Sequence, residues 1–205
     1  MFKESTNPQN SESWLLDRLG KITASNAPKL ITKTGKKSSS AEELINRAVA
    51  ERIIGKPEET YVSPAMERGS DLEDSALDFI NFTYEFSFKK AGFLDSGKGY
   101  GCSPDGIDHH KKIGLEIKCP LSWNHLSYVV GGKLPDKYIQ QIQFSLLVTG
   151  FDTWIFSSYH PDLKSFLVEV KRDEEYINKM QTILDESCAL IKLRYEKYSD
   201  YKREF

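Results

Sequence analysis

"GCSPDGIDHHKKIGLEIKCP" (residues 101–120) contains two β-type segments joined by a charged turn. In its second half, small or apolar residues alternate with Glu116 and Lys118, which is the two-residue period of a strand with both side chains on one face. The first half contains SPDG, so Asp105 falls at the end of the preceding strand. If the two strands pair, all three charged side chains share one face of the sheet.

Carboxylates that meet at one place repel each other unless a divalent cation lies between them. Hard oxygen ligands favour Mg²⁺ or Mn²⁺ over Zn²⁺, and such an ion polarises a phosphoryl oxygen and generates hydroxide from bound water. Lys118 could orient the attacking water, or deprotonate it if its pKa is lowered. A Glu-x-Lys pattern on a strand is usually a solvated face, but the apolar flanks of GLEIKCP favour a site. The pattern therefore predicts phosphodiester hydrolysis.

Short β-type runs begin at residue 86 and predict five strands. They are residues 86–94, 100–107, 115–120, 153–160 and 165–172. The sequence DSGKG predicts a hairpin between the first two strands, and the helical segments that precede the fourth predict a crossover to a parallel neighbour. The predicted class is α/β, with a central mixed five-stranded sheet flanked by helices.

Apolar residues at helical spacing predict the remaining elements. The predicted helices are residues 14–19, 41–54, 65–86, 122–130, 136–150 and 173–202, together with a short helix capped by Thr23 or Ser25. Residues 1–12 are expected to form a flexible arm, residues 56–64 a loop, and residues 173–205 to contain the C-terminal helix. A length of 205 residues fits a single domain, 1–205.

The overall charge excludes a strong global attraction to polyanions. The chain has 28 basic and 30 acidic residues, a formal net charge of −2, so any contact with nucleic acid must be local. The three cysteines, at 102, 119 and 188, form no paired framework. Their spacing relative to His109 and His110 does not match a zinc motif, and three cysteines are too few for a four-cysteine iron–sulfur cluster. No signal peptide or membrane-spanning run is visible, so we expect a cytoplasmic protein without a membrane partner.

Four ordered motifs resemble one nuclease family. SPDG followed by LEIKCP is similar to the PD-(D/E)xK nuclease superfamily, and more closely to the phage lambda exonuclease family, the YqaJ-like recombinases. LDRLGKITAS (16–25), RGSDLEDSA (68–76) and YIQQIQFSLLVTG (138–150) resemble that family's N-terminal signature, acidic helix and glutamine helix. The resemblance covers roughly residues 13–190 and implies a restriction-endonuclease-like core.

The resemblance implies a role for each matching residue of the metal site. Asp105 and Glu116 match the metal-binding carboxylates, and the backbone carbonyl of Ile117 a further ligand. Lys118 matches the catalytic lysine, and Glu73 an acidic residue near the metals. The expected cofactor is Mg²⁺, for which Mn²⁺ could substitute. We expect two ions, although the sequence alone does not separate one metal from two.

The resemblance also implies a pocket for the 5′-phosphate of a DNA end, formed by Arg18, Ser25, Ser103 and Gln141. A planar guanidinium with two hydroxyls and an amide suits a terminal phosphate. Taken singly, Arg18 is more often a surface ion-pair partner, Ser25 a helix cap and Gln141 part of a polar helix face. Only their joint order favours the phosphate pocket.

The function implied is a Mg²⁺-dependent 5′→3′ exonuclease that digests one strand of linear double-stranded DNA and leaves a 3′ single-stranded overhang for phage-type recombination. The family further implies a ring-shaped homotrimer around DNA, a single-strand annealing protein as partner, and a phage or prophage origin in a bacterial host. One alternative is a restriction- or repair-type endonuclease with the same metal site. Another is a non-catalytic module that binds DNA ends.

Overall fold

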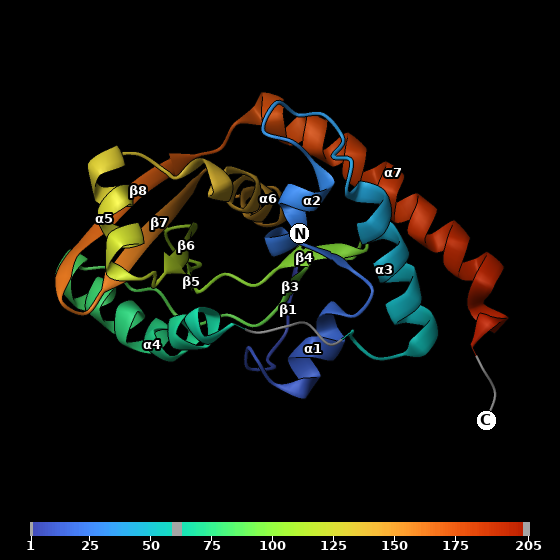
Figure 1. The fold of residues 1–205 in the computed structure, drawn as a ribbon, viewed down its shortest axis with the longest axis horizontal. Helices are drawn as coiled ribbons and strands as arrows, with labels where there is room; N and C mark the ends of the chain where they lie inside the picture. Colours follow the sequence, from blue (N-terminus) through green and yellow to red (C-terminus); the bar gives the residue numbers. More distant parts are fainter. Residues whose placement is uncertain (1, 59–62, 203–205) are drawn as a thin grey trace.

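The computed structural model describes residues 2–58 and 63–202 and has helices arranged around two sheets (Figure 1). The predicted mixed α/β class is confirmed. The strand count differs, because the structure has two four-stranded sheets in place of one central five-stranded sheet. Parts of the predicted loop at 56–64 and the last residues of the predicted C-terminal segment lie outside the described residues.

The first sheet is built from short strands of two or three residues. Its order is β1 (Lys3–Glu4), β3 (Leu94–Asp95), β4 (Tyr100–Cys102) and β2 (Ile22–Thr23). β3 and β4 form the predicted antiparallel hairpin, and β2 lies parallel to β4. The hairpin turn contains Gly97 and Gly99, both with positive φ, which glycine adopts at little cost.

The second sheet carries the longer strands. Its order is β5 (Gly106–Asp108), β6 (Ile113–Lys118), β7 (Thr153–His160) and β8 (Leu163–Lys171). β5 and β6 are antiparallel, β6 and β7 are parallel, and β7 and β8 are antiparallel. The predicted crossover to a parallel neighbour is therefore confirmed, since the segment between β6 and β7 is helical.

The strand predicted at 100–107 is wrong as one element, because it divides into β4 and β5, which belong to different sheets. The break falls at residues 103–105. Pro104 has no N–H to give to a ladder, which is consistent with a change of sheet at this point. The strand predicted at 86–94 is also largely wrong, since only Leu94 belongs to β3 and Lys89 forms an isolated bridge with Ile107.

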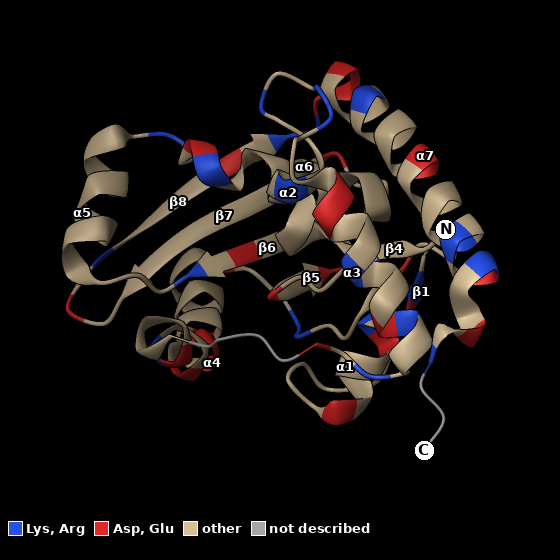
Figure 2. Cartoon of the chain, turned by 45° about the vertical axis from the view of Figure 1, so that its right-hand side comes forward, with Lys and Arg blue, Asp and Glu red and all other residues tan. Residues whose placement is uncertain are grey.

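Six of the helices have seven residues or more. They are α1 (Glu12–Arg18), α3 (Ala41–Ile54), α4 (Pro64–Tyr84), α5 (Ser122–Gly131), α6 (Ile139–Thr149) and α7 (Glu174–Tyr198). The short ones are η1 (Ala24–Asn26), α2 (Ala27–Leu30), η2 (Asp136–Tyr138) and η3 (Ser199–Tyr201). α7 carries charges of both signs along its length, as expected for a helix with one solvated face (Figure 2).

Side chains and glycines explain where several helices begin and end. The hydroxyls of Ser11 and Ser63 accept hydrogen bonds from the first turns of α1 and α4, and Gly55 ends α3 in the left-handed region. Neither Thr23 nor Ser25 caps a helix through its side chain. Their hydroxyls are 3.1 Å apart and hydrogen-bond to each other, so the predicted cap is not formed.

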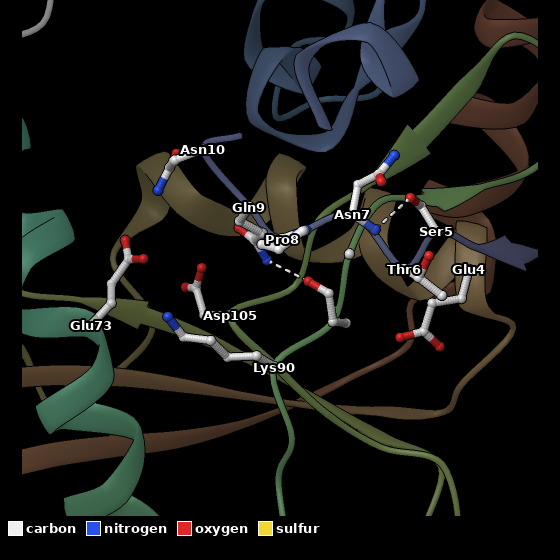
Figure 3. A pocket seen from close by; sticks show the side chains of 12 residues that line it. Glu4, Ser5, Thr6, Asn7, Pro8, Gln9, Asn10, Glu73, Lys90 and Asp105 are labelled. Atoms are coloured by element: carbon white, nitrogen blue, oxygen red, sulfur yellow. Dashed lines mark hydrogen bonds between the residues drawn. The ribbon is translucent and has the colours of Figure 1, made fainter. Parts of the chain in front are cut away.

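Residues 3–10, which we call the N-terminal strap, run along the body of the protein (Figure 3). They are not the free arm predicted for residues 1–12. β1 pairs with β3, and the backbone N–H of Ser5 donates to the carbonyl of Phe93 at 2.9 Å. The side chains of Ser5 and Asn7 both donate to Asp17 Oδ2. A sequence this polar contains no apolar pattern from which its docking could be predicted.

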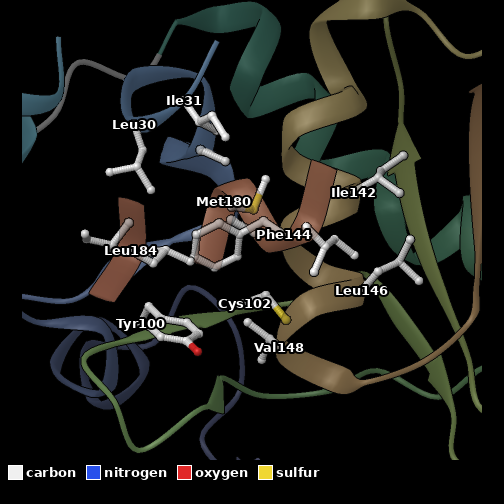
Figure 4. Close-up of a cluster of buried hydrophobic side chains, with 14 of the residues drawn as sticks. Leu30, Ile31, Tyr100, Cys102, Ile142, Phe144, Leu146, Val148, Met180 and Leu184 are labelled. Atoms are coloured by element: carbon white, nitrogen blue, oxygen red, sulfur yellow. The ribbon is translucent and has the colours of Figure 1, made fainter. Parts of the chain in front are cut away.

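The main core is assembled around α6 (Figure 4). Ile142, Phe144 and Leu146 of this helix are fully buried, and they meet Met180 and Leu184 of α7 in the same cluster. A second, smaller cluster joins α4 to β6 and β7. The three cysteines are free, as expected. The smaller cluster, through Leu115 and Ile117, packs one face of β6 against α4 and so holds the strand that carries the charged pair.

We expect Gly114→Ala to destabilise the protein by about 1–3 kcal/mol, as overpacking does in a filled core. A Cβ at Gly114 would lie 2.3 Å from two atoms of the fully buried Trp154 ring. Gly69→Ala is the matched control, because a Cβ there meets no atom within 4 Å and lies within α4, so it should be neutral or slightly stabilising. Urea unfolding of the three proteins measures the difference, and equal midpoints would contradict this packing.

Candidate active site

The hairpin of β5 and β6 brings Asp105 and Glu116 together. The backbone N–H of Asp105 donates to the carbonyl of Leu115 at 3.1 Å, and Asp105 Oδ2 accepts from the backbone N–H of Ile117 at 2.6 Å. Glu116 is almost completely buried, with 2% of its surface exposed. The side chain of Asp105 is therefore held against the strand that carries Glu116, as the alternation in the sequence predicts.

Lys118 and Gln141 complete this cluster around Glu116. Lys118 Nζ is 2.5 Å from Glu116 Oε1, and Gln141 Nε2 donates to the same oxygen at 2.6 Å. The lysine ammonium also lies 5.5 Å from the ring centre of Tyr138, within the range of a cation–π interaction. Tyr138 is a site residue that the sequence reasoning missed, although it is the first residue of the quoted glutamine-helix motif.

Burial and mutual repulsion both act on the carboxylates. Burial raises the pKa of Asp105 well above its usual value, and the charge of Glu116 raises it further, while Lys118 opposes the shift. The pKa of Glu73, on α4, is also raised, first by burial, with Lys118 and Lys90 opposing and Glu116 adding to the shift. The cluster therefore resists holding all its negative charges without a further cation.

Lys118 carries its proton in this arrangement. Burial lowers its pKa, but the charges of Glu116 and Asp105 outweigh this effect and raise the pKa above its usual value. The condition set by the sequence, a lowered pKa that would let Lys118 deprotonate water, is not met here. Lys118 can act instead as a fixed positive charge that orients an anionic or polar group.

The donor set fits a hard divalent cation. Two facing carboxylates, with ionisation of Asp105 hindered by burial and by Glu116, supply the hard oxygen ligands that Mg²⁺ or Mn²⁺ takes. Within residues 2–58 and 63–202, no three histidine, cysteine, aspartate or glutamate side chains gather as a ready-made metal site. Asp105 and Glu116 would thus hold a Mg²⁺ ion that keeps several water ligands, as this ion usually does in proteins.

A second site lies beside α1. A cavity of about 500 Å³ is lined by residues that include Arg18, Ser25 and Trp14. The guanidinium of Arg18 stacks at 4.0 Å over the Trp14 ring, and Arg18 Nη1 donates to Ser103 Oγ at 3.5 Å. Trp14 Nε1 donates to the same hydroxyl at 3.0 Å. The structure therefore gathers three of the four predicted phosphate-pocket residues, and adds Trp14, which lies one helical turn from Arg18.

Arg18 has little anionic compensation in this cavity. Burial lowers its pKa to about 10, with only weaker opposing effects from Cys102 and Glu51, so the guanidinium remains charged at neutral pH. In the described part of the chain Arg18 makes no ion pair, because Glu51 is paired with Arg47 at 3.1 Å. A partly buried cation without a carboxylate partner is suited to binding an anion from outside.

Gln141 lies elsewhere than the predicted pocket would place it. Its amide is bound to Glu116 in the carboxylate cluster, whereas Ser25 is exposed at the rim of the cavity beside α1. The two groups of residues are linked along the chain, since Ser103 of one group is two positions before Asp105 of the other.

No helix in the described ranges has the length and apolar character needed to cross a membrane.

The fold is mixed α/β, and two carboxylates and a lysine converge near a cavity lined by Arg18. This combination fits the nuclease class of proteins. The sequence profile of the YqaJ-like viral recombinase domain matches residues 13–152, and the chain belongs to that family. A comparison with curated protein sequences gives no match.

Solved structures agree with this assignment. The structure is similar to an alkaline exonuclease, LHK-Exo from Laribacter hongkongensis, with 28% identity, a TM-score of 0.82, and coverage of 93% of this chain and 97% of that one. The complex of LHK-Exo with dAMP matches with 29% identity, a TM-score of 0.81 and the same coverage. A phage-related exonuclease from Haemophilus somnus 129PT, at 13% identity, TM-score 0.69 and coverage of 86% and 96%, shows the shared fold alone. Together the family and the neighbours support a nuclease role.

We expect Asp105→Asn to stabilise the protein by about 0.5–2 kcal/mol at pH 8 in the presence of a chelator. The neutral amide would remove the repulsion between the Asp105 and Glu116 carboxylates, and changes that relieve a destabilised functional site commonly have effects of this size. A carboxyl whose folded pKa is raised contributes stability below its unfolded pKa, near 4, and loses that contribution as pH rises through the folded value. The gain should therefore shrink as pH falls toward 4. Denaturant unfolding across this pH range is the measurement.

The control for this change is Asp78→Asn, on the exposed side of α4, which should leave stability within about 0.5 kcal/mol of the wild type, as surface substitutions usually do. If Asp105→Asn destabilised the protein equally at pH 8 and near pH 4, the carboxylate would not be under the repulsion described here.

Proposed function

We propose that the protein is a Mg²⁺-dependent 5′→3′ exonuclease that digests one strand of linear double-stranded DNA and leaves a 3′ single-stranded overhang. The observation that carries this proposal is the short chain link between the two sites. Ser103, which bonds the unpaired Arg18, is two residues from Asp105, which faces Glu116. A phosphate held by Arg18 would therefore lie beside the chain segment that leads into the carboxylate cluster, where a bound substrate can be held for reaction.

Each group of the carboxylate cluster has a task in phosphodiester hydrolysis. Asp105 and Glu116 would hold Mg²⁺, which when bound supplies a polarised phosphoryl oxygen and an activated water. Lys118, beside Glu116, would orient the attacked phosphate or the water with its charge. Gln141 holds the Glu116 carboxylate in place, and Glu73 adds negative charge at the edge of the cluster.

The polarity of digestion would follow from the cavity beside α1. Arg18 offers a charged, planar donor set already stacked on Trp14, so little order is lost when it binds a terminal phosphate. Each cut would expose a new 5′-phosphate that can advance into this cavity. Support also comes from the LHK-Exo complex with dAMP, because a nucleoside monophosphate is the type of product that an exonuclease releases.

The proposal includes an assembly and a partner. A homotrimeric ring around DNA would reconcile sustained digestion with a net charge of −2, because encirclement hinders dissociation without a strongly basic surface. A single-strand annealing protein that takes over the 3′ overhang would complete phage-type recombination. Analytical ultracentrifugation tests the first of these, and copurification with an annealing protein tests the second.

One experiment separates this function from its rivals. Linear duplexes labelled at either the 5′ or the 3′ end are incubated with the protein and Mg²⁺, with a covalently closed circle alongside. Release of 5′-end label first, with the circle intact, is expected. Cutting of the circle would instead indicate an endonuclease, and retention of ends without cutting would indicate a binding module.

Asp105→Ala should lower the rate of digestion by on the order of 1,000-fold or more, since a metal-ion site contributes several kcal/mol to transition-state stabilisation. Binding of DNA ends should persist, because Arg18 and Trp14 are untouched. Gel-shift and digestion assays measure the two properties, with Asp78→Ala as the control on an exposed surface. Digestion at the wild-type rate would show that the carboxylate cluster is not the catalytic site.

Arg18→Ala should reduce the preference for 5′-phosphorylated over 5′-hydroxyl ends by about 10- to 100-fold, the equivalent of one charge-assisted hydrogen bond of about 1.5–3 kcal/mol. Arg47→Ala is the matched control, because Arg47 lines the same cavity but is paired with Glu51 and Glu58. Competition between the two kinds of end measures the preference. An unchanged preference in Arg18→Ala would remove the phosphate assignment.

A further inference from the structure

The N-terminal strap lies against the segment that carries Asp105. A cavity of about 640 Å³ lies beside the strap (Figure 3). It is lined by Glu4 to Asn10 of the strap and by Glu73, Lys90, Ala91, Gly92 and Asp105. Asp105 and Glu73 belong to the carboxylate cluster, so the strap forms the opposite wall of the space next to it. The family profile begins at residue 13, so it assigns no role to the strap.

Gln9 is the contact between the strap and the site. Its amide nitrogen donates one hydrogen bond to the carbonyl of Pro104 at 2.8 Å and another to the carbonyl of Ala91 at 2.9 Å. A dashed line marks the second of these bonds in Figure 3. Both hydrogens of the amide are thus used on two chain segments that are distant in sequence. The side chain is half-buried, which strengthens both bonds relative to those of an exposed glutamine.

The bond to Pro104 acts on the peptide unit that leads into Asp105. The carbonyl of that unit accepts from Gln9, and its N–H, which belongs to Asp105, donates to Leu115 at 3.1 Å. The unit is therefore held at both of its polar atoms. Because a peptide unit is a rigid plane that ends at the next Cα, holding both atoms fixes the Cα of Asp105, and the bond from Ile117 N–H to Oδ2 then holds its carboxylate.

The strap is itself held in place close to Gln9. The backbone of Ser5 lies directly over Gly92, where a Cβ would be only 2.2 Å from the Ser5 carbonyl oxygen. Asn7 Nδ2 donates to Asp17 Oδ2 at 2.9 Å, and Ser11 caps α1 just beyond the strap. Gln9 thus extends from a support with anchors on either side, which a positioning group requires.

We propose that Gln9 is a positioning residue that sets the direction of the Asp105 carboxylate, and that the strap is an integral part of the nuclease site. This inference rests on the proposed function for its metal-dependent consequence. Gln9 touches neither the metal nor the DNA, and acts through the peptide unit that joins Pro104 to Asp105. Partners that orient a metal-binding carboxylate typically contribute 10- to 100-fold to metal affinity or activity.

Two variants test the proposal. Gln9→Met keeps the length of the side chain and removes both donors, leaving the carbonyls of Pro104 and Ala91 without this partner. Asn7→Ala is the matched control, since it removes no contact with Pro104 and leaves the strap held by the pairing of β1 with β3 and by the bonds of Ser5 to Phe93 and Asp17. Unfolding by urea establishes that both variants are folded.

The first measurement needs no metal. The backbone N–H of Ile117 donates to Asp105 Oδ2, so its hydrogen exchange, followed by NMR, reports on the position of that carboxylate. In the presence of a chelator, Gln9→Met should exchange this amide at least about 10-fold faster than the wild type, and Asn7→Ala should not. Equal exchange in the wild type and Gln9→Met would overturn the proposal.

The second measurement uses Mn²⁺ binding followed by electron paramagnetic resonance, together with digestion kinetics. Gln9→Met should bind Mn²⁺ about 10- to 100-fold more weakly and show a lower kcat at saturating metal, with unchanged affinity for DNA ends. Equal losses in Gln9→Met and Asn7→Ala would indicate general loosening of the strap and would also overturn the proposal. If the wild type neither binds Mn²⁺ nor cuts DNA, the proposed function is wrong, and the exchange of Ile117 still decides the role of Gln9.

Discussion

The candidate site is organised around one electrostatic constraint, the close approach of the Asp105 and Glu116 carboxylates in a poorly solvated space. Burial makes ionisation of Asp105 harder, and the charge of Glu116 adds to this effect. The register of β5 and β6 makes the approach unavoidable, because pairing of Gly106 with Leu115 places the preceding residue, Asp105, next to Ile117 and Glu116. A protein that keeps such a pair must hold it with contacts from every side.

Those contacts come from elements that are far apart in the sequence. Lys118 neutralises part of the charge from within β6, Gln141 of α6 bonds Glu116, and Gln9 of the N-terminal strap bonds the backbone beside Asp105. α6 can do this because its other faces are packed into the main core, which leaves it little freedom to move. Strain of this kind is typical of functional sites, where stability is given up for an arrangement that a ligand can use.

Local patterns in the sequence were sufficient for the long elements and for part of the site. α3, α4 and α7 follow from apolar spacing, and the alternation around Glu116 correctly placed it beside Lys118. The division of the strands into two sheets could not be predicted, because β1 and β2 have two residues each and too little pattern to detect. The docking of the strap, and with it Gln9, had no sequence signal, since polar side chains that bond distant carbonyls leave no periodicity.

Residue types and the two-residue period of a strand are enough to specify which chemical groups are present and which of them share a strand face. Packing of the whole chain brings Arg18 onto Trp14, with no carboxylate partner among the residues that the structure describes, and brings Gln141 to Glu116. It also decided that the pKa of Lys118 is raised and not lowered, since this depends on how far two carboxylates lie from its ammonium. Distances between groups remote in the chain are set by packing, and no local pattern contains them.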